Sequence, residues 1–109
     1  MKLFSKPNSG ILTVKNELYS LFFNCTRLGL KPMGAHGHDD SLSIQLNVNN
    51  IPFVIQKGTF NYHTRKIKLR NYFRSRNSYS TVFSTNNLVN PISNMMWSKF
   101  PSVSLDLIN

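Results

Sequence analysis

The stretch from Phe53 to Arg76 constrains the fold of this chain most, because it concentrates positive charge and contains no acidic residue. Between Lys57 and Arg76 lie seven of the thirteen Lys and Arg residues and none of the four Asp and Glu residues. Two short runs of β-type residues, 53–56 and 67–72, are flanked by polar and basic residues. The pattern predicts an extended basic β-ribbon that projects from a compact base toward an anionic partner.

Length and charge narrow the class of protein. A chain of 109 residues fits one domain, which we expect to span residues 1–109. The formal net charge of +9 and the 12% aromatic content favour nucleic acid over a membrane surface as the partner. The sequence has no apolar run of about 18 residues, and residues 1–10 lack the apolar core of a secretory signal. We therefore expect an intracellular protein with no membrane partner.

The N-terminal third predicts an arm, a strand and a helix. Residues 1–10 are interpreted as an arm, because residues 7–10 form a turn-prone cluster. The β-branched run 11–14 predicts a first strand. After it, apolar residues follow helical spacing from Asn16, a candidate N-cap, to Gly29, a candidate C-terminal stop. This pattern predicts a helix over residues 16–29 whose apolar stripe covers a sheet.

The rest of the chain predicts further strands and one more helix. Apolar and polar residues alternate over 41–48, which predicts a strand with one buried face, and the asparagine pair 49–50 predicts a turn. Near the C-terminus, an Asn-Pro pair predicts the start of a short helix over 90–100, and alternation over 103–107 predicts a last strand.

The predicted order is strand, helix, two or three strands, helix, strand. This order favours an α+β fold, a two-layer sandwich of ferredoxin-like type. We expect a mainly antiparallel sheet with two helices on one face, and a long basic ribbon, residues 53–76, that projects from it.

The AHGHDD segment contains the cluster that most resembles a metal or acid–base site. Its four candidate ligands are His36, His38, Asp39 and Asp40. A structural zinc site usually needs four well-placed ligands, and His63 is the one further histidine in the chain. We therefore expect a solvated polar loop with no metal, no cofactor and no catalytic residue. A small metal-dependent nuclease built on these side chains is the enzymatic alternative.

The basic ribbon carries the predicted binding site. Its cations can neutralise phosphates, its aromatic rings can stack on bases, and arginine can bind phosphate bidentately. The alternative is that the aromatic side chains pack into the protein's own core. The residues assigned to RNA binding are Lys57, Tyr62, His63, Arg65, Lys66, Lys68, Arg70, Arg74 and Arg76.

With this order of elements, the chain resembles the S-ten family of small-subunit ribosomal proteins. The strand and glycine-terminated helix predicted over 11–29 are similar to the start of that family. The stretch FVIQKGTFNYHTRKIKLR, residues 53–70, looks like its exposed basic ribbon. The stretch ISNMMWSKFPSVSLDLI, residues 92–108, is similar to its short helix, proline break and final strand. Segments 40–50 and 77–90 look like insertions relative to the family.

The resemblance implies a non-enzymatic structural protein of the small ribosomal subunit head that supports translation. Its implied partners are small-subunit rRNA and neighbouring head proteins, with no small-molecule substrate. The many Asn, Lys, Ile and Phe residues, against one Ala, are expected of AT-rich codons. Together with the departures from the family, this bias indicates an organellar version and a mitochondrial location. A second non-enzymatic hypothesis is a viral or parasite RNA-binding module outside ribosomes.

Overall fold

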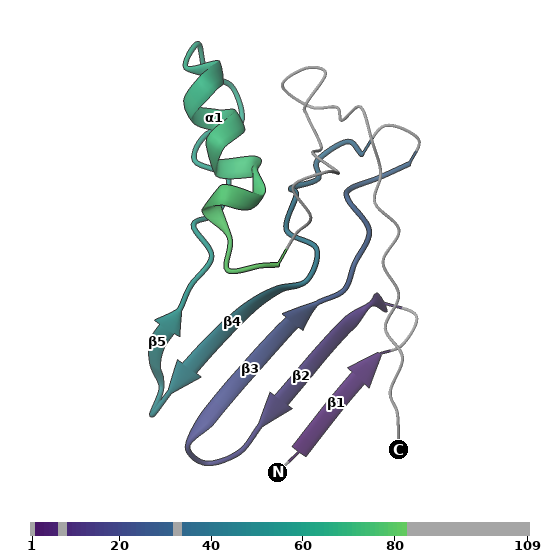
Figure 1. The fold of residues 1–109 in the computed structure, drawn as a ribbon, viewed down its shortest axis with the longest axis vertical. Coiled ribbons are helices and arrows are strands. Elements are labelled where there is room, and N and C mark those ends of the chain that lie inside the picture. The colour runs from purple at the N-terminus through teal and green to yellow at the C-terminus, as the bar shows by residue number, and fades with distance from the viewer. Residues whose placement is uncertain (1, 7–8, 32–33, 83–109) are drawn as a thin grey trace.

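The computed structural model describes residues 2–6, 9–31 and 34–82. They form a five-stranded antiparallel sheet, one α-helix and a short 3-10 helix, which agrees with the predicted α+β class (Figure 1). The strands are β1 (Lys2–Lys6), β2 (Ile11–Lys15), β3 (Tyr19–Asn24), β4 (Ser43–Val48) and β5 (Ile51–Val54). Each strand pairs with its neighbour in the chain, in the order β1-β2-β3-β4-β5. The helices are α1 (Ile67–Arg74) and the 3-10 helix η2 (Arg76–Ser78).

The register of the central strands gathers apolar residues on one face of the sheet. Residues directly opposite one another in antiparallel strands point to the same face. Two rows therefore cross β2, β3 and β4, and all of their side chains are partly buried. The rows are Leu12, Phe23 and Ile44, and Val14, Leu21 and Leu46. The strand predicted over 11–14 is confirmed, and the strand predicted over 41–48 is confirmed from Ser43 to Val48, since residues 41–42 form a turn.

The helix predicted over residues 16–29 is wrong, because β3 occupies its centre. Asn16 makes bonds of the kind expected of an N-cap, since its Oδ1 accepts the backbone N–H groups of Leu18 (2.9 Å) and Tyr19 (2.7 Å). Here they close the turn between β2 and β3, in which Asn16 N donates to the Tyr19 carbonyl at 3.0 Å. The same side-chain chemistry serves a helix start and a β-turn, and strand pairing on both sides of β3 decides between them.

The turn predicted at Asn49 and Asn50 is confirmed. Both residues have positive φ, 51° and 61°, as a two-residue type I′ hairpin requires. Asparagine tolerates this left-handed conformation better than most residues. The turn joins β4 directly to β5, where Val48 stands opposite Ile51.

The predicted basic ribbon over residues 53–76 is also wrong in its second half. β5 ends at Val54, a loop follows, and the run 67–72, for which the residue types predict a strand, lies within α1. The misleading feature is an inverted amphipathic pattern. Arg70 and Arg74, four residues apart on one helical face, are 2% and 1% exposed, whereas Leu69 is 39% exposed. If the arginines are assumed to face solvent, the segment does not show a helical period, and its β-type residues suggest a strand.

The remaining fold predictions can be compared with the structure only in part, because some of them concern residues outside the described ranges. Residues 2–6 of the predicted arm form β1, which pairs with β2. α1 lies beyond the sheet end where β3 stops and β4 starts, so in the described part of the chain no α-helix covers a sheet face (Figure 1). The ferredoxin-like arrangement is not shown, and the helix predicted over 90–100 and the strand over 103–107 lie outside the described residues. No helix among those residues is long and apolar enough to cross a membrane.

The loop between β3 and β4, residues 25–42, is folded tightly on itself through glycines. Leu30 and Ala35 exchange two backbone hydrogen bonds of 2.9 and 3.1 Å. Gly29 has φ +55°, and a Cβ added there would lie 2.3 Å from the Gly34 carbonyl oxygen. This approach leaves no room for any side chain at residue 29.

We expect Gly29→Ala to lower the free energy of unfolding by about 2–4 kcal/mol, because backbone strain and a steric clash add together. Gly58→Ala is the matched control. Gly58 also has positive φ (+72°), but an added Cβ would meet nothing within 4 Å, so its cost should be about 1 kcal/mol. Urea denaturation of both variants measures the difference in unfolding free energy. Equal losses would show that the close approach at Gly29 adds no cost to a side chain at that position.

Candidate functional site

A polar pocket of about 410 Å³ lies where the β3–β4 loop meets the segment after β5. Its walls come from the β3–β4 loop, the segment after β5 and the segment after η2. The lining residues are Thr26, Arg27, Gly29, His36, Gly37, His38, Asp40, Gln56, Gly58, Thr59 and Tyr79. The volume falls in the range typical of small-molecule sites. Three segments that are distant in sequence thus meet at the helical end of the sheet.

His38 and Tyr79 form the chemical centre of this pocket. The Nδ1 atom of His38 is in short hydrogen-bonding contact with the Tyr79 hydroxyl group. The other ring nitrogen, Nε2, lies 3.3 Å from the Thr59 hydroxyl oxygen. Both nitrogens of the imidazole therefore have a hydroxyl partner, and both hydroxyl groups belong to residues that line the pocket.

Burial sets the protonation state of this pair. Burial, together with the nearby Arg74 and Arg70 charges, lowers the pKa of His38 to about 4. Burial also raises the pKa of Tyr79, and the Asp40 carboxylate adds to that rise while Arg74 opposes it. At neutral pH the pocket therefore holds a neutral imidazole, which can accept a proton, beside a neutral phenol, which can donate one.

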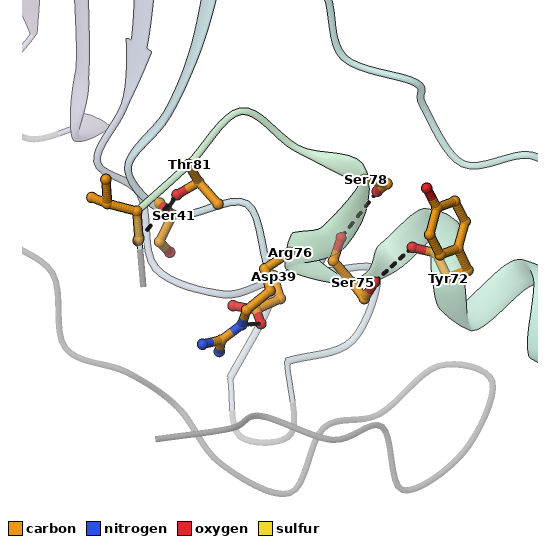
Figure 2. Close-up of polar contacts among 8 residues, drawn as sticks. Asp39, Ser41, Tyr72, Ser75, Arg76, Ser78 and Thr81 are labelled. Carbon is orange, nitrogen blue, oxygen red and sulfur yellow. Dashed lines mark hydrogen bonds and ion pairs between the residues drawn. The ribbon is translucent and has the colours of Figure 1, made fainter. Parts of the chain in front are cut away.

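Two buried arginines hold the part of the loop that carries His38. Arg74 Nε donates to the Gly37 carbonyl oxygen at 3.2 Å, and the Asp39 N–H donates to the Arg74 carbonyl at 2.8 Å. Arg76 Nε donates to Asp39 Oδ2 at 2.5 Å in a buried ion pair (Figure 2). Charge-assisted bonds of this kind are stronger than neutral ones. They fix the residues on both sides of His38 to the helical segment.

A third arginine, Arg70 of α1, organises the neighbouring loop. Arg70 Nε donates to the carbonyl oxygens of Asn61 (3.1 Å) and Tyr62 (3.2 Å), and its guanidinium carbon lies 5.8 Å from the Tyr62 ring centroid. The Tyr62 hydroxyl contacts His36 Nδ1 in turn. Each histidine of AHGHDD therefore has a tyrosine partner, but the His36 pair is exposed and the His38 pair is partly buried.

The segment after η2 is also tied to the β3–β4 loop. Thr81 Oγ1 donates to the Ser41 carbonyl at 2.7 Å (Figure 2). The Ile44 N–H donates to the Ser80 carbonyl at 3.0 Å. These bonds fix the chain immediately after Tyr79 and so restrict where its hydroxyl group can lie.

Asp40 gives the site a testable pH dependence. Burial and, to a smaller extent, the Asp39 charge raise the pKa of Asp40, against the opposing effect of its hydrogen bonds, to a net value of about 6. The folded chain therefore binds this proton more tightly than the unfolded chain, so Asp40 adds stability as pH falls through about 6 toward 4. His38 acts in the opposite sense, because its lowered pKa removes stability as pH falls from about 6.5 toward 4.

When the pH is lowered from 7 to about 4.5, we expect the free energy of unfolding to fall more in Asp40→Asn than in the parent chain. The reason is that the variant keeps the destabilising contribution of His38 and lacks the stabilising contribution of Asp40. Urea denaturation midpoints at the two pH values measure this. Glu17→Gln, which removes an exposed carboxylate, serves as control and should follow the parent. An Asp40→Asn midpoint that also follows the parent would contradict the assignment.

The nine residues predicted to bind RNA divide into two groups. Six are exposed: Lys57, Tyr62, His63, Arg65, Lys66 and Lys68. Three are buried: Arg70, Arg74 and Arg76. The buried arginines contact the protein's own carbonyl groups and Asp39, so the charge cluster of the sequence is partly an internal scaffold. Of the nine, none lines the pocket.

The sequence interpretation missed several pocket residues, of which Tyr79, Thr59 and Arg27 carry polar groups into the site. Tyr79 lies 41 residues after its partner His38, and no spacing rule connects positions so far apart. His38 itself stands out in the sequence, but as part of a solvated loop. One signal was available for Tyr79. It stands between two serines and is not part of a helical or strand pattern of apolar residues, so a role in the protein's core is not indicated.

The fold and pocket define a small α+β domain with an acid–base pair in a polar cavity. The model of a family described as Heparinase II/III-like, C-terminal, matches residues 2–101. This match covers most of the chain, and the chain belongs to that family. No curated protein and no solved structure matches the chain.

Family membership overturns the resemblance to the S-ten ribosomal family. The predicted non-enzymatic structural role is wrong, because the family is named for polysaccharide-degrading enzymes. The predicted partners, small-subunit rRNA and ribosomal head proteins, are wrong as well. The prediction that the protein has no small-molecule substrate is also wrong, because the family indicates a carbohydrate substrate. The physical reason is that two of the three stretches that carried the resemblance fold differently: the predicted helix contains a strand, and the predicted ribbon is a loop followed by a helix. The third stretch, residues 92–108, lies outside the described residues. Ribosomal and mitochondrial descriptions have no support in the family, and the cellular location stays a prediction.

Family membership also gives no support to a metal-dependent nuclease or to an RNA-binding module outside ribosomes. Among the described residues, no group of three or more His, Cys, Asp or Glu side chains is placed to hold a metal ion, so the nuclease has no ligand set there. Cys25 is buried, and its burial raises the pKa of the thiol. A protonated, buried thiol is a poor nucleophile.

Proposed function

We propose that this chain is a domain of a polysaccharide-cleaving enzyme whose pocket binds an acidic sugar and cleaves its glycosidic bond by elimination. The observation that carries the proposal is the contact between neutral His38 and the Tyr79 hydroxyl on the pocket wall. Membership of the Heparinase II/III-like, C-terminal family supports a carbohydrate substrate. Heparin is a polymer of acidic sugars, which suits a chain with a net charge of +9.

Elimination next to a carboxylate requires a base and an acid on the same sugar. The base removes the proton from the carbon that bears the carboxylate. The released electron pair forms a carbon–carbon double bond to the neighbouring carbon, the glycosidic bond on that neighbour breaks, and the acid protonates the leaving oxygen. A positioned acid and base each contribute typically 10²- to 10⁴-fold to such a step.

His38 and Tyr79 fit these two roles. In the tautomer whose Nδ1–H donates to the Tyr79 oxygen, the Nε2 electron pair faces the Thr59 hydroxyl group, and it takes the sugar proton once the sugar displaces that contact. The Tyr79 hydroxyl then gives its own proton to the leaving oxygen. The imidazolium returns its Nδ1 proton to Tyr79 through the contact between them, which restores the phenol. After product release, His38 loses its Nε2 proton to water and gains one at Nδ1, which restores the starting tautomer.

Arg27 supplies positive charge at the pocket. It is exposed and lines the wall beside Thr26, where its planar guanidinium can bind the sugar carboxylate bidentately. Neutralising that carboxylate makes the adjacent proton easier to remove. Asp40 lines the same pocket, and its raised pKa, about 6, reduces its repulsion of an acidic sugar in mildly acidic solution.

The experiment is to incubate the full chain with heparin and follow ultraviolet absorbance, because elimination creates a double bond conjugated with the carboxylate. We expect absorbance to rise with heparin and not with dextran, a neutral polymer that cannot form this product. Arg27→Gln should slow the reaction by raising KM. The absence of any absorbance change with heparin would overturn the proposal.

A further inference from the structure

A second cationic surface lies beside the pocket, on the exposed side of α1. Lys68 and Tyr72 are four residues apart and therefore share one helical face. Lys57, from the segment after β5, reaches this face: its Nζ lies 3.3 Å from the Tyr72 hydroxyl and 5.4 Å from the ring centroid. All three side chains are exposed. We call Lys57, Lys68 and Tyr72 the outer site.

The outer site is connected to the pocket through the chain itself. Lys57 immediately precedes Gly58 and Thr59, which line the pocket wall. Thr59 is the residue whose hydroxyl group lies beside His38 Nε2. A ligand that extends from the pocket along residues 57–59 therefore reaches Lys57 and the Tyr72 ring.

The charge of the outer site has no carboxylate partner within the described residues. The ion pair found among the described residues joins Arg76 and Asp39, which are both buried and do not belong to the outer site. Glu17 lies in the β2–β3 turn, at the end of the sheet opposite α1 (Figure 1). Two further exposed cations, Arg65 and Lys66, immediately precede α1. Asp40, the remaining carboxylate of the described residues, lines the adjacent pocket. The exposed cations outnumber it, so this surface attracts anions.

We propose that the outer site binds the sulfate or carboxylate groups of an acidic polysaccharide beyond the sugar held in the pocket. The inference rests on the proposed function, because it assigns the direction in which the polymer leaves the pocket. The lysines bind anionic groups, and the exposed Tyr72 ring offers an apolar surface on which a sugar ring can pack. A polymer with charges on successive sugars can satisfy both cations at once, whereas a short fragment cannot.

The test compares two lengths of heparin fragment, a disaccharide and one of about ten sugars, by calorimetric titration of the full chain. The double variant Lys57→Gln/Lys68→Gln should bind the long fragment about tenfold more weakly at low salt, since each exposed charge contributes modestly. Its affinity for the disaccharide should not change. Lys68→Gln alone should weaken long-fragment binding more than Lys15→Gln, the matched control, which removes an exposed lysine of β2.

The outcomes separate the outer site from the pocket. Arg27→Gln, which removes the cation of the pocket wall, should weaken binding of both lengths. If it changes neither while the lysine variants weaken the long fragment, the outer site stands and the pocket proposal fails. Equal effects of Lys68→Gln and Lys15→Gln, or no binding of the long fragment by the parent chain, would overturn the outer site. Tighter binding of an RNA oligonucleotide of equal charge would also overturn it. Unchanged circular dichroism of the lysine variants checks that they fold.

Discussion

Replacing Asp39 with alanine should lower the free energy of unfolding by about 3–5 kcal/mol, because it leaves the buried Arg76 guanidinium without its carboxylate. Arg76 is 8% exposed and Asp39 6% exposed, so water cannot replace the lost partner without opening the structure. The pair also joins the β3–β4 loop to the helical segment. Urea denaturation measures the loss, and the pocket should loosen with it.

Two variants make this prediction specific. Glu17→Ala removes an exposed carboxylate and should change stability by less than about 0.5 kcal/mol. The double variant Asp39→Leu/Arg76→Met removes both charges and should recover much of the loss, because two apolar side chains do not need each other's charge. An Asp39→Ala chain within about 1 kcal/mol of the parent would show that the ion pair does not hold the loop.

The second large effect concerns His38 and Tyr79. We expect His38→Gln and Tyr79→Phe each to lower kcat for heparin elimination by about 10²- to 10⁴-fold, because each removes one partner in proton transfer. KM should change little, since neither side chain supplies the positive charge that binds the sugar. Because the pair acts as a unit, the double variant should lose little more than the worse single variant.

His63→Gln is the matched control for this series. His63 is exposed and does not line the pocket, so its substitution should leave kcat unchanged. Urea denaturation of Tyr79→Phe checks that the loss is chemical, since Tyr79 is partly buried. A Tyr79→Phe chain with full stability and full kcat would remove the tyrosine from the mechanism.

The sequence predicted the parts of the sheet in which local pattern and pairing agree. Alternation over β4 and the Asn49-Asn50 turn each have one structural solution. Residues 16–29 have two structural solutions. The apolar residues of the stretch fit a helical period, whereas its aromatic centre fits a strand. Pairing of β3 with both β2 and β4 decided the outcome, and such long-range pairing is not written in the local pattern.

The candidate site was harder to predict, for two physical reasons. Arginine is almost never fully buried unless paired, so a segment with Arg70 and Arg74 inside reverses the usual amphipathic pattern. Charge also does not identify its partner, because phosphate, sulfate and carboxylate polymers attract the same cations. His38 was visible as part of a polar cluster, whereas its neutrality and its contact with Tyr79 depend on burial and on a distant segment.

The central claim is that the pocket cleaves an acidic polysaccharide by elimination through His38 and Tyr79. Mass spectrometry of the products of heparin treatment tests it most directly, because an elimination product is lighter by one water molecule than the corresponding hydrolysis product. We predict unsaturated fragments of the lighter mass from the parent chain and from His63→Gln, and at least about 10²-fold less of them from His38→Gln in the same time. Products of the hydrolysis mass, or unsaturated products undiminished in His38→Gln, would contradict the account.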